Sequence, residues 1–165
     1  MSDTPDLSLP VKSPEYDNNT ALTPAPIYTL VDLTDTELAD LQRVCEAECI
    51  DTGNEPGANV RIAPQPRFIG QPLRAVFDHH LELVKEKKFE PRWFIAVADK
   101  EWRSKGVILV TLDDDELERN VDSFRIRAAN TGLTVANLQV ANSDWAEEKE
   151  NYEFDLDGDD DDDED

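Results

Sequence analysis

Two short apolar runs, residues 93–98 and 107–112, dominate the hydrophobic pattern of the chain. Both runs are rich in β-branched residues and contain almost no polar position, which is typical of strands covered on both faces. The residues between them are mostly polar, although they include Trp102. We therefore expect two central strands, with the other elements arranged to cover them.

The first part of the pattern predicts a strand over residues 27–33 and then a helix to about residue 49. Thr34 and Glu37 have the spacing of a capping box, in which two side chains satisfy free N–H groups at the start of a helix. The apolar residues that follow form one helical stripe of Leu38, Leu41, Cys45 and Cys49. Glu46 and Glu48 fall outside this stripe, so we expect both side chains to face solvent.

Alternating apolar and polar positions predict a half-exposed strand over residues 58–63, which Pro64 and Pro66 end. A second helix is expected after Gly70, with Pro72 at the first helical position, where its missing N–H costs nothing. The buried face of this helix is expected to consist of Leu73, Val76, Phe77, His80, Leu81 and Val84. Strand and helix thus alternate through the first half of the chain.

The second half is less regular. Residues 123–127 alternate like an edge strand, and residues 130–132 have the composition of a turn. For residues 133–140 two alternatives stay open, a strand or a short helix followed by a strand. Ser143 is expected to cap a last helix that contains Trp145.

The order of these elements predicts one compact α/β or α+β domain, in which a mixed β-sheet packs with two to three helices. We assign this domain to residues 27–150. Residues 1–26 are rich in Pro, Ser, Thr and Asp without periodicity, so we expect a disordered lead-in. Residues 151–165 are expected to form a disordered acidic tail.

The charge of the chain is strongly acidic and unevenly distributed. Its 16 Lys and Arg residues stand against 38 Asp and Glu residues, which gives a net charge of −22. Residues 144–165 contain 14 acidic residues and one lysine, so they carry −13 of that total. A field of this sign repels phosphates and anionic lipids and attracts basic proteins. We therefore expect no direct nucleic-acid binding and no membrane partner.

Two cysteines do not make a disulfide framework, and the chain has no apolar run long enough for a membrane span or a signal peptide. A cytoplasmic or nuclear location is therefore expected, with the thiols reduced.

Asn137, Asn142, Asp144 and Trp145 belong to a compact motif near the end of the chain: Asn, Leu, a polar residue, an aliphatic residue, Ala-Asn, any residue, Asp, an aromatic residue and acids. We call residues 137–148 the closing motif. It resembles the closing pattern of a family of small domains of unknown function found in fungal and bacterial proteins. Stretches 31–35, 108–112 and 124–127 fit the same family in order. The resemblance spans roughly residues 27–148 and implies one compact domain, without a particular chemistry.

Cys45 and Cys49 lie one helical turn apart, and two adjacent histidines, His79 and His80, could complete a tetrahedral metal site with them. However, both cysteines belong to the apolar stripe, and adjacent histidines on a helix diverge by about 100°. We therefore expect the cysteines to pack in the core. His80 is expected to be a hydrogen-bonded, partly buried imidazole and His79 to be solvated. No metal or cofactor is expected.

A second candidate site is a group of polar residues that could converge at one end of the sheet as a ligand cluster. It consists of Asp32, Asn137, Asn142 and Asp144. Residues of these types at the ends of elements mostly serve as turn and cap residues. The chain also has no nucleophile motif and no Gly-rich phosphate loop. An enzyme or small-ligand-binding domain that uses this cluster is therefore the alternative function.

The acidic tail carries the strongest functional signal. Like charges keep such a segment extended, so one interpretation is a tail that only increases solubility. The other interpretation starts from the aromatic residues ahead of the acids, because such side chains can anchor in apolar pockets while carboxylates pair with Lys and Arg. This composition is similar to that of acidic-aromatic segments in histone chaperones.

We therefore expect a non-enzymatic protein-interaction module whose tail binds or shields a basic protein partner. The residues expected to bind this partner are Tyr152, Phe154, Asp155, Asp157, Asp159, Asp160, Asp161, Asp162, Asp163, Glu164 and Asp165.

Overall fold

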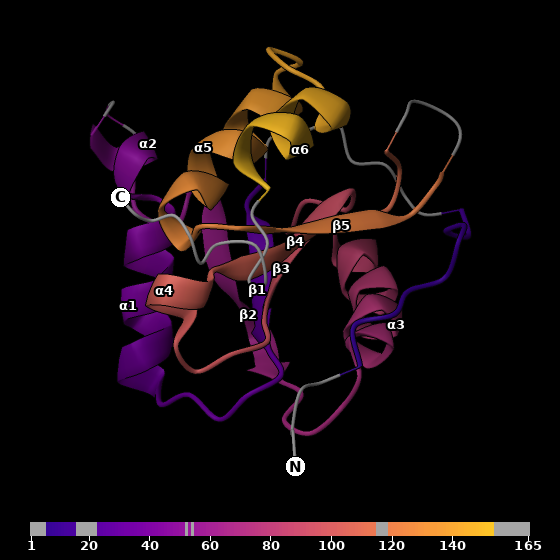
Figure 1. Ribbon diagram of the computed structural model, residues 1–165, viewed down its shortest axis with the longest axis horizontal. Helices are drawn as coiled ribbons and strands as arrows, with labels where there is room; N and C mark the ends of the chain where they lie inside the picture. Colours follow the sequence, from indigo (N-terminus) through magenta and orange to yellow (C-terminus); the bar gives the residue numbers. More distant parts are fainter. Residues whose placement is uncertain (1–5, 16–22, 52, 54, 115–118, 154–165) are drawn as a thin grey trace, which may run out of the picture.

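The computed structural model describes residues 6–15, 23–51, 53, 55–114 and 119–153 (Figure 1). These residues form one α/β domain around a mixed five-stranded sheet with the strand order β2-β1-β3-β4-β5. The strands are β1 (Ala25–Thr29), β2 (Val60–Arg67), β3 (Trp93–Val97), β4 (Val107–Thr111) and β5 (Asp122–Ile126). β1 is parallel to β2 and β3, whereas β3, β4 and β5 are antiparallel neighbours. The predicted class and the mixed sheet are confirmed.

The two apolar runs form β3 and β4, which lie in the interior of the sheet and are buried along their whole length. Their side chains alternate between two separate core clusters. Ile95 and Val97 belong to one cluster, and Phe94 and Ala96 to the other. Apolar side chains cover both faces of the sheet at these strands. Polar and apolar residues therefore do not alternate along them, as the sequence pattern indicated.

Helices cover both faces of the sheet (Figure 1). α1 (Asp35–Cys45), α5 (Ala128–Gln139) and α6 (Trp145–Tyr152) contribute to the first core cluster. α3 (Leu73–Leu83) lies on the opposite face and contributes to the second cluster, and the short helix η1 (Val84–Glu86) continues it. In the part of the chain that the structure describes, no helix is long and apolar enough to span a bilayer.

α1 begins as predicted. The N–H of Glu37 donates to Thr34 Oγ1 at 3.1 Å, and the N–H of Thr34 donates to Glu37 Oε1 at 2.8 Å. The helix ends at Cys45, however, and a separate short helix, α2 (Ala47–Asp51), follows. At the break, Glu46 is buried rather than solvated, because both of its carboxylate oxygens accept from the N–H of Gly57 at 2.9 Å.

The predicted turn at residues 130–132 is wrong, because this segment lies inside α5. The helix runs from Ala128 to Gln139, so residues 133–139 are helical and contain no strand. Gly132 lies where α5 approaches α1 closely. A Cβ at this position would lie 2.4 Å from the carbonyl oxygen of Cys45 on α1. The glycine that indicates a turn in the sequence therefore lets two helix backbones pack against each other.

Two further findings concern the polar segments. Residues 6–15 fall within the expected disordered lead-in, and they contact the domain: the N–H of Leu73 donates to Asp6 O at 2.8 Å, and the N–H of Val121 donates to Val11 O at 3.0 Å. The disorder of the lead-in stays a prediction. The connector between β3 and β4 contains a helical turn, α4 (Trp102–Lys105), and Trp102 is buried in the first cluster. Local polarity concealed both segments because only one or two side chains in each are buried.

Two helix starts differ by one residue from the prediction. Pro72 is the residue before α3 rather than its first helical position, and it makes no side-chain cap. α6 is capped by Asp144, whose Oδ1 accepts from the N–H of Glu147 at 2.9 Å, and not by Ser143.

Candidate functional site

The closing motif forms the connection between α5 and α6. After α5 the N–H of Asn142 donates to Asn137 O at 2.9 Å, and the N–H of Ala141 donates to Leu138 O at 3.2 Å. This pair of bonds is the Schellman arrangement, which ends helices with one residue in the left-handed region. Ala141 is that residue, with φ of 57°. The side chains of Asn137 and Asn142 join at 3.3 Å, so both asparagines stabilise the helix end.

The start of α6 is tied to β5. Trp145 Nε1 donates to Asp122 Oδ2 at 2.8 Å, and Lys149 Nζ lies 3.0 Å from the same carboxylate. The hydroxyl of Ser143 donates to the buried carboxylate of Glu148 in a short hydrogen bond. These contacts fix the position of α6 on the sheet, and they turn Lys149 inward.

Under this connection lies a cavity of about 260 Å³. Its polar and aromatic lining comes from three separate segments and consists of Arg92, Trp93, Asp114, Ser143, Asp144 and Trp145. The first two stand at the start of β3, and Asp114 follows β4. The N–H of Leu112 donates to Arg92 O at 2.8 Å, which holds these two strand ends together.

Two buried polar atoms of the lining have no hydrogen-bond partner in the structure. They are the indole Nε1 of Trp93 and Oδ1 of Asp114. Trp93 is only 5% exposed, so water has little access to its donor. A buried polar group without a partner loses its hydration and gains nothing in return, which costs about 1–3 kcal/mol. Two further buried atoms of the described residues, His79 Nε2 and Glu148 Oε1, also have no partner.

Arg92 also lines the cavity, but it does not pair with Oδ1 of Asp114. Its guanidinium carbon is 5.1 Å from the centroid of the Trp93 ring, and its Nε donates to Asp113 O at 2.9 Å. The buried carboxylate of Glu90 accepts from the backbone N–H of Arg92 at 3.1 Å and from Gln139 Nε2 at 2.8 Å. Burial raises the pKa of Glu90, and these hydrogen bonds and the charge of Arg92 oppose the rise.

The structure does not bring the four residues of the predicted ligand cluster together. Asn137 and Asn142 are partners in the helix end, and Asp144 lines the cavity. Asp32 follows the carboxyl end of β1, whereas α5 ends near the residues that precede β1, where Gln139 donates to Thr23 O at 2.7 Å. Asp32 therefore lies at the other end of the sheet.

Tyr152 is the last residue of α6, and its side chain packs against the first core cluster. It is thus part of the folded domain, two residues beyond the predicted boundary at residue 150. The other residues predicted to bind the partner lie outside the described residues: Phe154, Asp155, Asp157, Asp159, Asp160, Asp161, Asp162, Asp163, Glu164 and Asp165.

The outward face of α6 is acidic. Glu147 and Glu150 on the helix are exposed, as are Asp144 and Glu153, which flank its two ends, and we call these four residues the acidic face of α6. No ion pair among the described residues includes any of them. The one basic residue of the helix, Lys149, is engaged by Asp122 instead.

Both cysteines are buried, as expected. Burial raises the pKa of Cys45 to about 12 and also raises the pKa of Cys49. Among the described residues no group of three or more His, Cys, Asp or Glu side chains is arranged to hold a metal ion.

His80 is fully buried between β1 and the start of β3. Its Nε2 lies 2.9 Å from Pro91 O, which only accepts, so Nε2 carries the proton and Nδ1 accepts from the hydroxyl of Tyr28 at 3.2 Å. Burial lowers the pKa of His80 to about 4. His79 is half-buried against Phe68 and Tyr28 rather than solvated.

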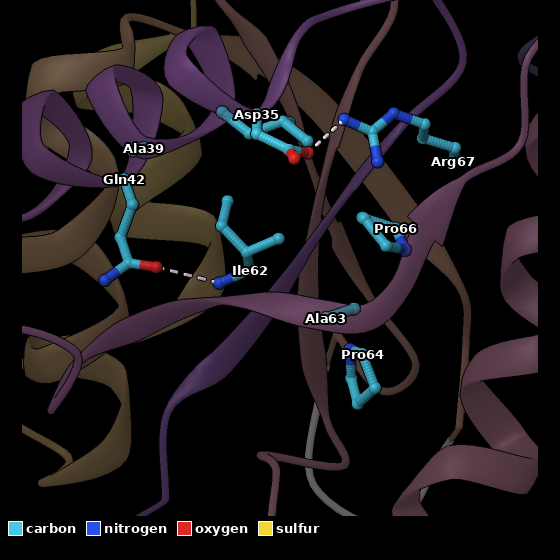
Figure 2. Close-up of a pocket in the computed structure, with 9 residues that line it drawn as sticks. Asp35, Ala39, Gln42, Ile62, Ala63, Pro64, Pro66 and Arg67 are labelled. Atoms are coloured by element: carbon cyan, nitrogen blue, oxygen red, sulfur yellow. Dashed lines mark hydrogen bonds and ion pairs between the residues drawn. The ribbon is translucent and has the colours of Figure 1, made fainter.

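A second hollow, a groove of about 380 Å³, runs between α1 and the edge strand β2 (Figure 2). Gln42 reaches across it and accepts from the N–H of Ile62 at 2.9 Å, while Pro64 and Pro66 have no N–H to offer (Figure 2). An ion pair of 2.6 Å joins Asp35 to Arg67 at the same groove. These features deny a further strand the donors that it would need at this edge, so the groove protects the sheet from edge-to-edge pairing.

No family model, curated protein or solved structure matches the chain. The resemblance stated for the closing motif therefore stays a prediction, although the structure gives Asn137, Asn142 and Asp144 roles in the α5–α6 connection. Sequence reasoning missed the cavity, because Trp93 reads as core and Asp114 as part of a charged turn. The pairing of Trp93 with Thr111 and the hydrogen bond from Leu112 to Arg92 bring these two segments together.

Proposed function

We propose that this chain is a non-enzymatic protein-interaction module whose acidic C-terminal segment binds or shields a basic protein partner. The segment comprises residues 154–165, which contain nine acidic residues and no basic one. The acidic face of α6 leads directly into it. Together they present carboxylates without competing cations, and such a surface attracts Lys and Arg side chains over several ångströms.

The observation that carries this proposal is the way α6 divides its charges. Lys149 turns inward to Asp122 at 3.0 Å, while Glu147, Glu150 and Glu153 stay exposed. If the acidic residues served solubility alone, the helix could pair its charges on its own surface at little cost. The arrangement supports an electrostatic surface that starts on a rigid helix, so that part of the binding site needs no ordering when the partner arrives.

The structure changes one detail of the predicted binding residues. The ring of Tyr152 packs against the core and has its own role in holding the end of α6. We therefore assign the aromatic contact with the partner to Phe154 and the electrostatic contact to the acids that follow it. Replacing Tyr152 would disturb the domain, so it is unsuitable for testing the function.

The test compares three full-length chains for binding to a short, labelled lysine-rich peptide at about 50 mM salt. In the amide variant the nine acids of residues 154–165 become Asn or Gln, which removes the charge and keeps the length. In the shuffled variant the same residues stand in a different order. We expect the amide variant to bind about tenfold or more weakly and the shuffled variant to bind within about twofold of the wild type. Equal affinity of the amide variant and the wild type would contradict the proposal.

A further inference from the structure

We propose that residues 154–157 of this chain add to the outer edge of β5 as a further strand, and that a partner which uses Phe154 must first release them. The occupant of the edge is thus a segment of the same chain that lies outside the described residues. The strand addition goes beyond the proposed function, whereas the release by a partner rests on it.

β5 is the last strand of the sheet, and its backbone offers an edge for pairing. The N–H of Leu112 donates to Arg92 O, so residues 108 and 110 of β4 face β3, and residues 107, 109 and 111 face β5. The partners of these three in β5 are residues 126, 124 and 122. Ser123 and Arg125 therefore direct their N–H and C=O groups to the outer edge. Residues 11–13 bond to residues 119–121, just ahead of the strand.

The two edges of the sheet differ in how they are protected. On β2, Pro64 and Pro66 have no N–H, and Gln42 accepts from the N–H of Ile62. β5 contains no proline. Proteins commonly cover or block the edges of their sheets, because an open edge pairs with other chains. The contrast favours β5 as the edge at which a strand is added.

The end of α6 brings the segment close to this edge. Trp145 and Lys149 both contact Asp122 of β5, so α6 lies over the outermost strand (Figure 1). The helix ends at Tyr152, and Glu153 has extended backbone angles, with φ of −64° and ψ of 135°. Four extended residues span about 13 Å, and the five residues of β5 span about 17 Å. The segment is therefore long enough to pair along most of β5.

The apolar residues of the segment fit one face of the sheet. Phe154 and Leu156 are two positions apart, so they share a face when the segment is a strand. Phe124 and Ile126 of β5 belong to the first core cluster, and Tyr152 packs against the same cluster just before the segment. With Phe154 and Leu156 on this face, the cluster extends by one strand and two apolar side chains leave water.

The acidic residues of the segment then share the opposite face with arginines. Asp155 and Asp157 alternate with the apolar pair. Arg125 lies opposite Ile108, which belongs to the second core cluster, and Arg127 follows two positions later. Opposite charges on neighbouring strands stabilise the pair, and like charges destabilise it. This edge therefore favours the chain's own acidic segment over a segment of the basic partner.

Strand addition withholds part of the partner-binding segment. Phe154, which we assigned to the aromatic contact with the partner, is covered while the segment lies on β5. The affinity for a partner that needs this contact is reduced in proportion to the fraction of chains in which the segment is released. The acids of residues 159–165 lie beyond the added strand and remain available for the first encounter.

The test measures amide hydrogen exchange in full-length chains without a partner. Leu156→Pro places a proline inside the segment and Gly158→Pro places one just beyond it, and neither changes the charge. We expect the N–H groups of Ser123 and Arg125 to exchange about tenfold faster in Leu156→Pro than in the wild type, and within about twofold in Gly158→Pro. The N–H of Phe124, which faces β4, is the internal control. Equal exchange of Ser123 in the wild type and Leu156→Pro would overturn the inference.

A charge-matched pair of variants gives a second readout. Arg127→Gln removes an exposed charge beside the edge, and Lys88→Gln removes one at the other end of the sheet, where Glu90 bonds to Pro24. We expect Arg127→Gln to speed the exchange of Ser123 about two- to fivefold and Lys88→Gln to leave it unchanged. Equal effects of the two substitutions would overturn the choice of the acidic segment as the occupant.

Other outcomes are distinguishable. Protection of Ser123 that rises with chain concentration would assign the edge to a second copy of the chain. Saturating lysine-rich peptide is expected to bring the exchange of Ser123 toward that of Leu156→Pro, and unchanged protection would overturn the release step. If the amide variant binds the peptide like the wild type while Leu156→Pro loses protection, the proposed function fails and the strand addition holds.

Discussion

Buried polar side chains of this domain take their partners from segments far away in the sequence. The hydroxyl of Tyr28 donates to His80 across 52 positions, and Gln139 donates to Glu90 across 49. Each bond joins a helix to a strand or to the segment that precedes one. Removing one member would leave the other buried without a partner, which costs more than the bond itself contributes.

His80 gives the domain a specific response to acid. Its pKa is about 4 in the folded chain, against 6.5 for an ordinary histidine, because the charged ring cannot be solvated in the core. Between these two pH values the unfolded chain binds a proton that the folded chain does not. The stabilising contribution of the neutral ring is thus fully present above pH 6.5 and is lost as the pH falls toward 4.

We expect the free energy of unfolding of the wild type to decrease by about 1.4 kcal/mol per pH unit more than that of His80→Gln over this window. Urea denaturation at several pH values measures the difference. Parallel pH profiles for the wild type and His80→Gln would disprove this role of His80.

Gly132 offers a prediction in which two effects have opposite signs. Helix propensity alone predicts that Gly132→Ala stabilises α5 by about 1 kcal/mol. The added methyl group would lie 2.4 Å from the carbonyl oxygen of Cys45, however, and backbone on both sides must move to relieve this contact. We expect the packing effect to win and the variant to lose about 2 kcal/mol or more in chemical denaturation. A more stable variant would contradict the close approach of α1 and α5.

At the scale of elements, the end of α5 carries backbone strain that can be removed. Ala141 occupies the left-handed region at φ of 57°, where glycine is free of the Cβ penalty. We expect Ala141→Gly to stabilise the domain by about 0.5–1 kcal/mol, seen as a higher melting temperature. Val140→Gly at the preceding position, where φ is −99°, is the control and should destabilise the chain. An equal response at both positions would mean that the strain at Ala141 is absent.

The elements that the sequence predicted correctly depend on local signals. The capping box of Thr34 and Glu37 and the alternation-free strands β3 and β4 involve neighbours within a few positions. α5 was mispredicted because Gly132 serves a contact with α1, almost ninety positions earlier in the chain. The same reason accounts for Glu46, which is buried only because Gly57 donates to it.

The candidate site was predictable only in part. Asp144 stood out as a polar residue at the end of an element, and it does line the cavity. Arg92, Trp93 and Asp114 reach the same cavity through the pairing of β3 with β4 and the packing of α5–α6 above them. Trp93 and Asp114 each have a buried polar atom without a hydrogen-bond partner. A sequence does not show which polar atoms are paired in the folded chain.

At the scale of the whole molecule, negative charge is concentrated toward the C-terminal end of the chain. Residues 154–165 carry −9 of the net charge of −22, while the helices and strands bury apolar side chains in two clusters on either face of the sheet. The acidic face of α6 joins these two parts. Electrostatic attraction to a partner is screened by salt over a distance of about 10 Å at 0.1 M, so binding through this surface must depend strongly on ionic strength.

The salt dependence of binding tests this account most directly. The dissociation constant of the full-length chain for the lysine-rich peptide is measured from about 50 mM to about 500 mM salt, in parallel with the amide variant. We predict that the affinity of the wild type falls by about tenfold or more across this range, while that of the amide variant, already weak, changes much less. Identical salt dependence of the two chains would show that the acidic segment does not bind the partner.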